Sequence, residues 1–155
     1  MKKLLFLILT GPLMAFAHPS SSSINCNSAD KSTNVTVTDS ASGDGGLFLT
    51  INGFSDEIDQ VGMDKHVAGD TKWEPVNKGV STLYHTGNIR MYLDGVPAHI
   101  KNLFINGSKE DVSLSFDAQL SGEIFKRGDK GNDTYQVIGR TPVKCTFEFI
   151  NGTGN

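Results

Sequence analysis

Alternation of apolar and polar residues with a period of two is the feature of this sequence that most restricts its fold. The alternation is clearest over residues 111–120, where every second residue is apolar: Val112, Leu114, Phe116, Ala118 and Leu120. The residues between them are aspartate, serine and glutamine. Because successive side chains of a strand point to opposite faces, this run predicts an antiparallel strand with one buried and one solvent-exposed face.

The same alternation recurs along the chain. Val143, Cys145, Phe147 and Phe149 would share one face of a last strand, so Cys145 is expected to point into the core. Segments 120–126 and 134–140 have the pattern of a hairpin. Further strands are expected around Val35 and Val37, over 47–51, over 89–93 and over 100–105, the last being apolar on both faces and therefore expected in the centre of a sheet.

Turn-forming residues separate these segments. They occur at 42–46, Asn52-Gly53, Asp94-Gly95, Asn106-Gly107 and 128–133. Short strands with frequent turns predict an all-β fold, a small antiparallel β-sandwich or β-barrel of about eight short strands. Periodicity does not specify which strands pair, so sandwich and barrel both stay open.

The first residues have the three parts of a secretory signal. Met1-Lys2-Lys3 supplies positive charge, residues 4–9 are apolar, and Ala15-Phe16-Ala17 places small residues at a cleavage site. The apolar run is shorter than the ~20 residues that cross a bilayer. We therefore expect export to the periplasm or the extracellular space, with no transmembrane segment after cleavage.

The expected organisation has four parts: a signal peptide over 1–17, a flexible polar arm over 18–25, a single all-β domain over 26–150 and a disordered tail over 151–155. The chain has two cysteines, Cys26 and Cys145, which lie near the two ends of the predicted domain. Cysteines in an exported chain are usually paired. A disulfide between them would link the N-terminal and C-terminal strands.

Charge and motifs exclude several functions. The net charge is −3, and removal of Lys2 and Lys3 with the signal would make it −5. Without a cluster of lysine and arginine, the chain is poorly suited to bind nucleic acid, because phosphate binding needs concentrated positive charge. The sequence contains no G-x-S-x-G, H-E-x-x-H or Walker motif, so we do not expect an enzyme.

His18 is the candidate metal ligand. Cleavage after Ala17 would give it a free α-amine beside its imidazole, and the two nitrogens could chelate one ion. A second imidazole from His66, His85 or His99 would complete three nitrogen ligands, a set suited to Cu(II). The arrangement resembles the histidine brace of copper-dependent polysaccharide oxygenases and periplasmic copper carriers. The resemblance implies copper as a cofactor, with His18 and His99 as ligands; otherwise no cofactor is expected.

Two places are candidates for binding a partner. The long connection over 53–80 holds Trp73, the single tryptophan, with the acidic residues Asp70 and Glu74 close by in sequence. Tryptophan is enriched among the residues that dominate protein interfaces. The second place is the predicted hairpin tip, which presents an Arg-Gly-Asp sequence through Arg127 and Asp129.

These features favour an exported, non-enzymatic binding module that recognises a protein partner, of the inhibitor or envelope type. The alternatives are a copper-binding protein that uses His18 and a structural cell-surface component that uses an exposed β-edge. Leu120–Phe125 is similar to the Ser-Gly-x-x-Tyr segment of c-type lysozyme inhibitors, with Phe125 in place of tyrosine. Chaperone–usher pilins are also exported β-proteins with one disulfide, but their cysteines lie close together. We assign the chain to neither family.

Overall fold

The structure is a computed structural model that describes residues 20–39, 47–58, 72–76, 78–85, 88–128 and 131–152. The described part contains nine strands and one helix: β1 (Ser21–Ser28), β2 (Asn34–Asp39), β3 (Leu47–Ile51), β4 (Phe54–Ile58), β5 (Lys72–Val76), β6 (Gly79–His85), β7 (Ile89–Val96), α1 (Ala98–Asn106), β8 (Val112–Lys126) and β9 (Thr134–Ile150).

All nine strands belong to one antiparallel sheet in the order β4-β3-β2-β1-β9-β8-β7-β6-β5. Within the described residues no pairing joins β4 to β5, so the sheet is open and not a closed barrel. Because every pairing is antiparallel, the predicted all-β antiparallel class is confirmed. Two strands are longer than expected, since β8 has 15 residues and β9 has 17. The predicted hairpin over 120–126 and 134–140 forms their outer half, with Lys126 opposite Thr134.

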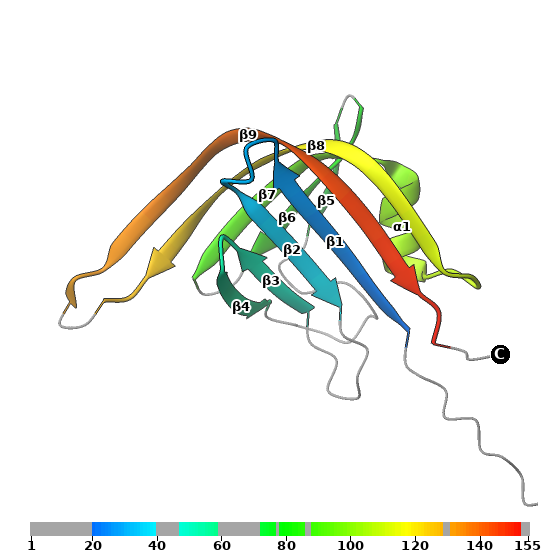
Figure 1. Cartoon of the computed structure of the whole chain (residues 1–155), viewed down its shortest axis with the longest axis horizontal. Helices are drawn as coiled ribbons and strands as arrows, with labels where there is room; N and C mark the ends of the chain where they lie inside the picture. Colours follow the sequence, from blue (N-terminus) through cyan, green and yellow to red (C-terminus); the bar gives the residue numbers. More distant parts are fainter. Residues whose placement is uncertain are drawn as a thin grey trace, which may run out of the picture.

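The sheet bends so that its two halves share one core. Figure 1 shows β1 to β4 nearer the viewer, β5 to β7 behind them, and β8 and β9 arching over both. Apolar side chains from both halves, such as Leu49 and Met91, are fully buried in a single cluster. The Lys126 ammonium lies 5.4 Å from the centre of the Phe54 ring, so β4 comes close to the far end of β8.

The prediction of a central strand over 100–105 is wrong, because these residues lie in α1. Ile100 and Phe104 are four positions apart, which puts both on one helical face, and both are buried. Phe104 lies with its ring centre 6.4 Å from that of Phe147 on β9. The helix ends at Gly107, which has φ 71° and whose N–H donates to the Leu103 carbonyl at 2.8 Å. A short apolar run does not distinguish a helix from a strand. The helix is favoured here because it buries Ile100 and Phe104 together.

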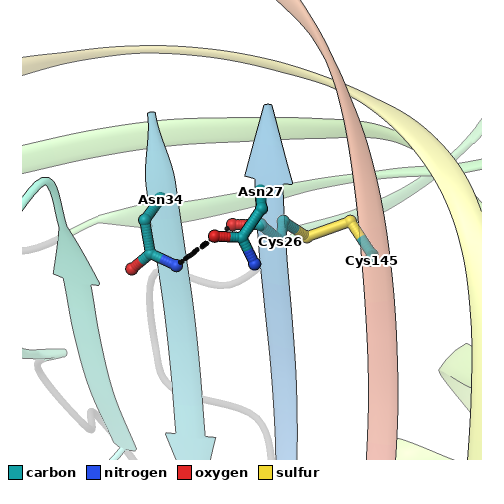
Figure 2. Close-up of a disulfide and its surroundings, with 4 residues drawn as sticks. All are labelled: Cys26, Asn27, Asn34 and Cys145. Atoms are coloured by element: carbon teal, nitrogen blue, oxygen red, sulfur yellow. Dashed lines mark hydrogen bonds between the residues drawn. A yellow bond between two sulfur atoms is a disulfide. The ribbon is translucent and has the colours of Figure 1, made fainter. Parts of the chain in front are cut away.

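The expected disulfide is present. Cys26 on β1 and Cys145 on β9 lie directly opposite each other, with an S–S distance of 2.04 Å, and both are buried in the core (Figure 2). Beside the bridge, the Asn34 amide donates to Asn27 Oδ1 at 2.9 Å and ties β2 to β1 (Figure 2). The bridge joins two residues that are 119 positions apart in the sequence.

The expected ends of the domain need two corrections. β1 begins at Ser21 and Ile24 is fully buried, so residues 21–25 of the predicted flexible arm form part of the sheet. Asn151, placed in the predicted tail, donates its backbone N–H to Asp111 Oδ1 at 2.8 Å. The predicted signal peptide, residues 18–19 and residues 153–155 lie outside the described residues.

In the part of the chain that the structure describes, no helix has the length and apolar character needed to cross a membrane.

Candidate functional site

The outer face of β7, β8 and the end of β9 next to the hairpin turn carries three of the five large hydrophobic side chains that are exposed among the described residues. Tyr135 is 59% exposed, Val137 69% and Tyr92 40%. The neighbouring residues along these strands, such as Met91 and Ile124, point inward and are buried. Alternation along three adjacent strands therefore places these apolar and aromatic groups together on the solvent side.

A polar network lies among these exposed side chains. Arg90 and Glu123 are opposite each other on β7 and β8, and Arg90 Nη1 donates to Glu123 Oε1 at 3.0 Å. From β9, the Tyr135 hydroxyl donates a hydrogen bond to Glu123 Oε2. One carboxylate thus links three strands and orients the exposed tyrosine.

The network also affects the ionisation of Tyr135. Its pKa is raised, chiefly because the hydroxyl donates to the Glu123 carboxylate, and the negative charge of that carboxylate further disfavours the phenolate. Tyr135 is therefore a neutral hydrogen-bond donor at physiological pH. Because Glu123 accepts from both Arg90 and Tyr135, the three side chains are held in a fixed arrangement, which is suited to recognition.

We call this surface the hairpin face and define it as Arg90, Tyr92, Glu123, Tyr135 and Val137. Tyrosine and arginine are enriched in protein interfaces, where a few aromatic side chains supply most of the binding energy. The surface lies on paired strands, so its shape is already formed in the absence of a partner. Binding therefore needs little ordering of the backbone.

A separate open cleft lies where β7 leaves β8, after the last paired residues Asp94 and Gln119. Its volume is about 870 Å³. The lining combines apolar groups with both signs of charge: Lys78, Asp94, Gly95, Pro97, Phe116, Asp117, Ala118, Gln119 and Arg140. Asp94 accepts from Ser81 Oγ at 2.5 Å and from Arg140 Nη2 at 3.4 Å, so its carboxylate has partners.

The predicted copper ligands are not brought together by the described part of the fold. His99 is exposed on α1, His85 lies in β6, and His18 and His66 lie outside the described residues. Among the residues that the structure describes, no three histidine, cysteine, aspartate or glutamate side chains are grouped so that they could hold a metal ion.

The predicted partner-binding residues are scattered. Trp73 and Glu74 lie in β5, at one end of the sheet, where they pair with Thr82 and Ser81 of β6. Arg127 is exposed directly after β8, and the structure does not describe Asp70 or Asp129. The connection over 53–80 is not one long loop, because it contains β4, β5 and the start of β6.

Sequence reasoning did not identify Arg90, Glu123 or Tyr135 as a group. The predicted hairpin already implied that the strand around Glu123 would face the strand around Tyr135. No signal in the sequence placed Arg90 beside them, because that contact depends on β7 pairing with β8.

Comparison with known proteins found no match to the chain among family models, curated proteins or solved structures.

Proposed function

We propose that this chain is an exported, non-enzymatic binding module that recognises a protein partner through the hairpin face. The observation that carries the proposal is the exposure of Tyr92, Tyr135 and Val137 on one side of three adjacent strands. Single exposed apolar residues are ordinary on a protein surface, but several exposed together are typical of a surface that contacts another protein.

A protein fits this surface better than a small molecule does. Small ligands are held in concave pockets that enclose most of their surface. The hairpin face is instead built on the outer side of a sheet, and the cleft beside Asp94 lies elsewhere in the fold. Arg90 and Glu123, which lie among the exposed aromatic and apolar groups, would contribute orientation, since charges that must match those of a partner favour one docking geometry over others.

Export is supported by two features of different kinds. The N-terminal sequence has the composition of a signal peptide. The buried Cys26–Cys145 disulfide belongs to a class of bond that forms and persists in oxidising compartments.

The test uses the binding partner captured by the wild-type chain from the fluid into which it is exported, with affinity then measured on purified proteins. We expect Tyr135→Ala with Val137→Ser to weaken binding by about thirtyfold or more, as loss of a central aromatic contact does. The matched control is Phe48→Ala, which removes another exposed aromatic group, 38% exposed on β3. Equal weakening by both variants, or by neither, would contradict the proposal.

A further inference from the structure

Two β-bulges adjoin the open cleft beside Asp94, one in each of the strands that pair with β8. A bulge inserts an extra residue into a strand, bends it and re-aims a side chain, and bulges are common next to binding sites. Gly95 is the extra residue of the bulge in β7, and Arg140 belongs to the bulge in β9. Both residues line the cleft, so the two irregularities of the described sheet meet at one place.

The bulge in β7 separates this strand from β8. Asp94 pairs with Ser81 of β6 and Val96 pairs with Val80, so Gly95 has no residue opposite it on β6. Gly95 has φ 90°, a backbone conformation that glycine adopts readily. The pairing of β7 with β8 ends at Asp94, immediately before the bulge. The cleft therefore begins where the bulge redirects β7.

The cleft has an apolar surface because it reaches the core. Phe116 and Ala118 of β8 belong to the buried hydrophobic cluster and also line the cleft, as does Pro97 at the start of α1. An apolar surface of this kind favours the apolar part of a ligand, because contact removes both from water. The volume of about 870 Å³ lies in the range of sites that hold small molecules.

The bulge in β9 brings Arg140 to the cleft. Gly139 and Arg140 together lie opposite Ser121 alone on β8. Arg140 Nη2 donates to Asp94 Oδ2 at 3.4 Å, and 71% of the arginine side chain is exposed. A guanidinium group has five N–H donors. Since this bond is the one that the side chain makes to the described residues, the remaining donors are available to a ligand.

The charged groups of the cleft favour an anionic ligand over a cationic one. The Asp94 carboxylate already accepts two hydrogen bonds, one of them from Arg140. Asp117 lies directly opposite Lys144 of β9, and both are exposed, so a positive charge compensates it. Lys78 makes no ion pair with any described residue. Both carboxylates thus have a cationic neighbour, whereas Lys78 and most donors of Arg140 have no acceptor in the described part of the chain.

We propose that this cleft binds a small carboxylic acid with a short apolar body. The ligand carboxylate would accept hydrogen bonds from Arg140, whose planar guanidinium matches the two oxygens of a carboxylate. Lys78 would add to the positive potential. The apolar body would cover Phe116, Ala118 and Pro97. The cleft is separate from the hairpin face, so this site goes beyond the proposed function and does not rest on it.

The test titrates the full chain with four small molecules and follows the backbone amide signals by NMR. Phenylacetate, phenylacetamide and phenethylamine share an aromatic body and differ in charge, whereas acetate has the carboxylate alone. We expect phenylacetate to bind with a Kd of about 1–10 mM, ordinary for so small a ligand, and the other three to bind at least about tenfold more weakly. The signals that move should be those of Gly95 and residues 117–119.

Arg140→Gln tests the contact with the carboxylate. We expect this variant to bind phenylacetate about tenfold more weakly, with the weak binding of phenylacetamide unchanged. Arg127→Gln is the matched control, because it removes another exposed arginine and changes the net charge equally, at a position that does not line the cleft. It should bind phenylacetate as the wild type does. Circular dichroism would confirm that both variants are folded.

Three results would overturn the proposal: no binding of phenylacetate up to about 50 mM, binding of phenylacetamide or phenethylamine as tight as that of phenylacetate, or equal binding of phenylacetate by Arg140→Gln and Arg127→Gln. Signal changes confined to residues outside the cleft count as the first of these results. Tyr135→Ala with Val137→Ser should leave phenylacetate binding unchanged, so failure here is distinguishable from failure of the proposed function.

Discussion

At the scale of single residues, Asp30 organises the turn between β1 and β2. Its carboxylate accepts from Ser28 Oγ at 2.6 Å and from the Ser32 N–H and hydroxyl at 3.1 and 2.8 Å. Ser28 Oγ in turn accepts from the Thr33 N–H at 2.9 Å. These bonds, led by that from Ser28, lower the pKa of Asp30 from its ordinary 3.8 to about 2. The ionised side chain is thus the form that fits the turn.

We expect this turn to make stability depend on pH. A carboxyl whose pKa is lowered by folding stabilises the protein above its unfolded pKa, and that stabilisation is lost as the pH falls from about 4 to about 2. In Asp30→Asn the midpoint of thermal unfolding should fall at pH 6 and change less between pH 5 and pH 2 than in the wild type. Parallel pH profiles for the two proteins would contradict this role.

Gly122 is a second residue whose identity the fold dictates. A Cβ there would lie 2.6 Å from the Arg90 carbonyl oxygen, which is rigid backbone of β7. We expect Gly122→Ala to destabilise the protein by roughly 1–3 kcal/mol, measured by urea unfolding, because β7 and β8 would be forced apart. Gly139→Ala is the control, since a Cβ there meets nothing within 4 Å. An equally large loss of stability in Gly139→Ala would show that strand propensity, and not the close approach of β7 to Gly122, causes the destabilisation.

At the scale of elements, α1 packs against the part of the sheet where β8 and β9 extend beyond β7. β8 and β9 extend beyond the end of β7, and Figure 1 shows α1 beside this extension. The helix covers the inner side of the extension through buried Ile100 and Phe104. Phe104 thereby joins the hydrophobic core next to Phe147 of β9.

We expect the packing of α1 to depend on Phe104. Phe104→Ala removes a fully packed ring from beside Phe147 and should cost about 3–5 kcal/mol in urea unfolding. Asn102→Ala changes an exposed residue of the same helix and should stay within about 0.5 kcal/mol of the wild type. A small effect at Phe104 would mean that the helix contributes little to the core.

At the scale of the whole molecule, the terminal strands meet in the interior of the sheet order. β1 to β4 form one half and β5 to β9 the other, and within the described residues the β1–β9 pairing is the ladder that joins them. The Cys26–Cys145 bridge crosses this ladder. The disulfide therefore cross-links the two halves of the fold at the ladder that joins them.

Removing the bridge should weaken the β1–β9 pairing more than it weakens other parts of the sheet. We expect Cys26→Ala with Cys145→Ala to destabilise the protein by about 4 kcal/mol, the order given by chain-entropy models for so long a loop. Hydrogen exchange should show the amides of β1 and β2 losing more protection than those of β7. Equal loss in all strands would indicate that the halves unfold as one unit even without the bridge.

Several site residues were accessible from the sequence, and others were not. Alternation placed Cys145 on the core side, and the alternation over 111–120 predicted the first part of β8. The hairpin face was missed because Arg90 and Glu123 lie 33 residues apart and meet through strand pairing. Pairing is set by the match of whole faces in three dimensions, which a period of two does not encode.

The sequence by itself determined the all-β class and the inward direction of Cys145, because alternation is a local property of the chain. It also determined the pairing of Cys145 with Cys26, because the chain has no other cysteine. Tertiary structure alone decided that residues 98–106 form a helix, since a short apolar run satisfies either geometry until its neighbours are present. It also decided the strand order and the incorporation of residues 21–25 into β1. Both depend on contacts between residues far apart in the sequence, and these contacts stabilise the fold only after distant strands have come together.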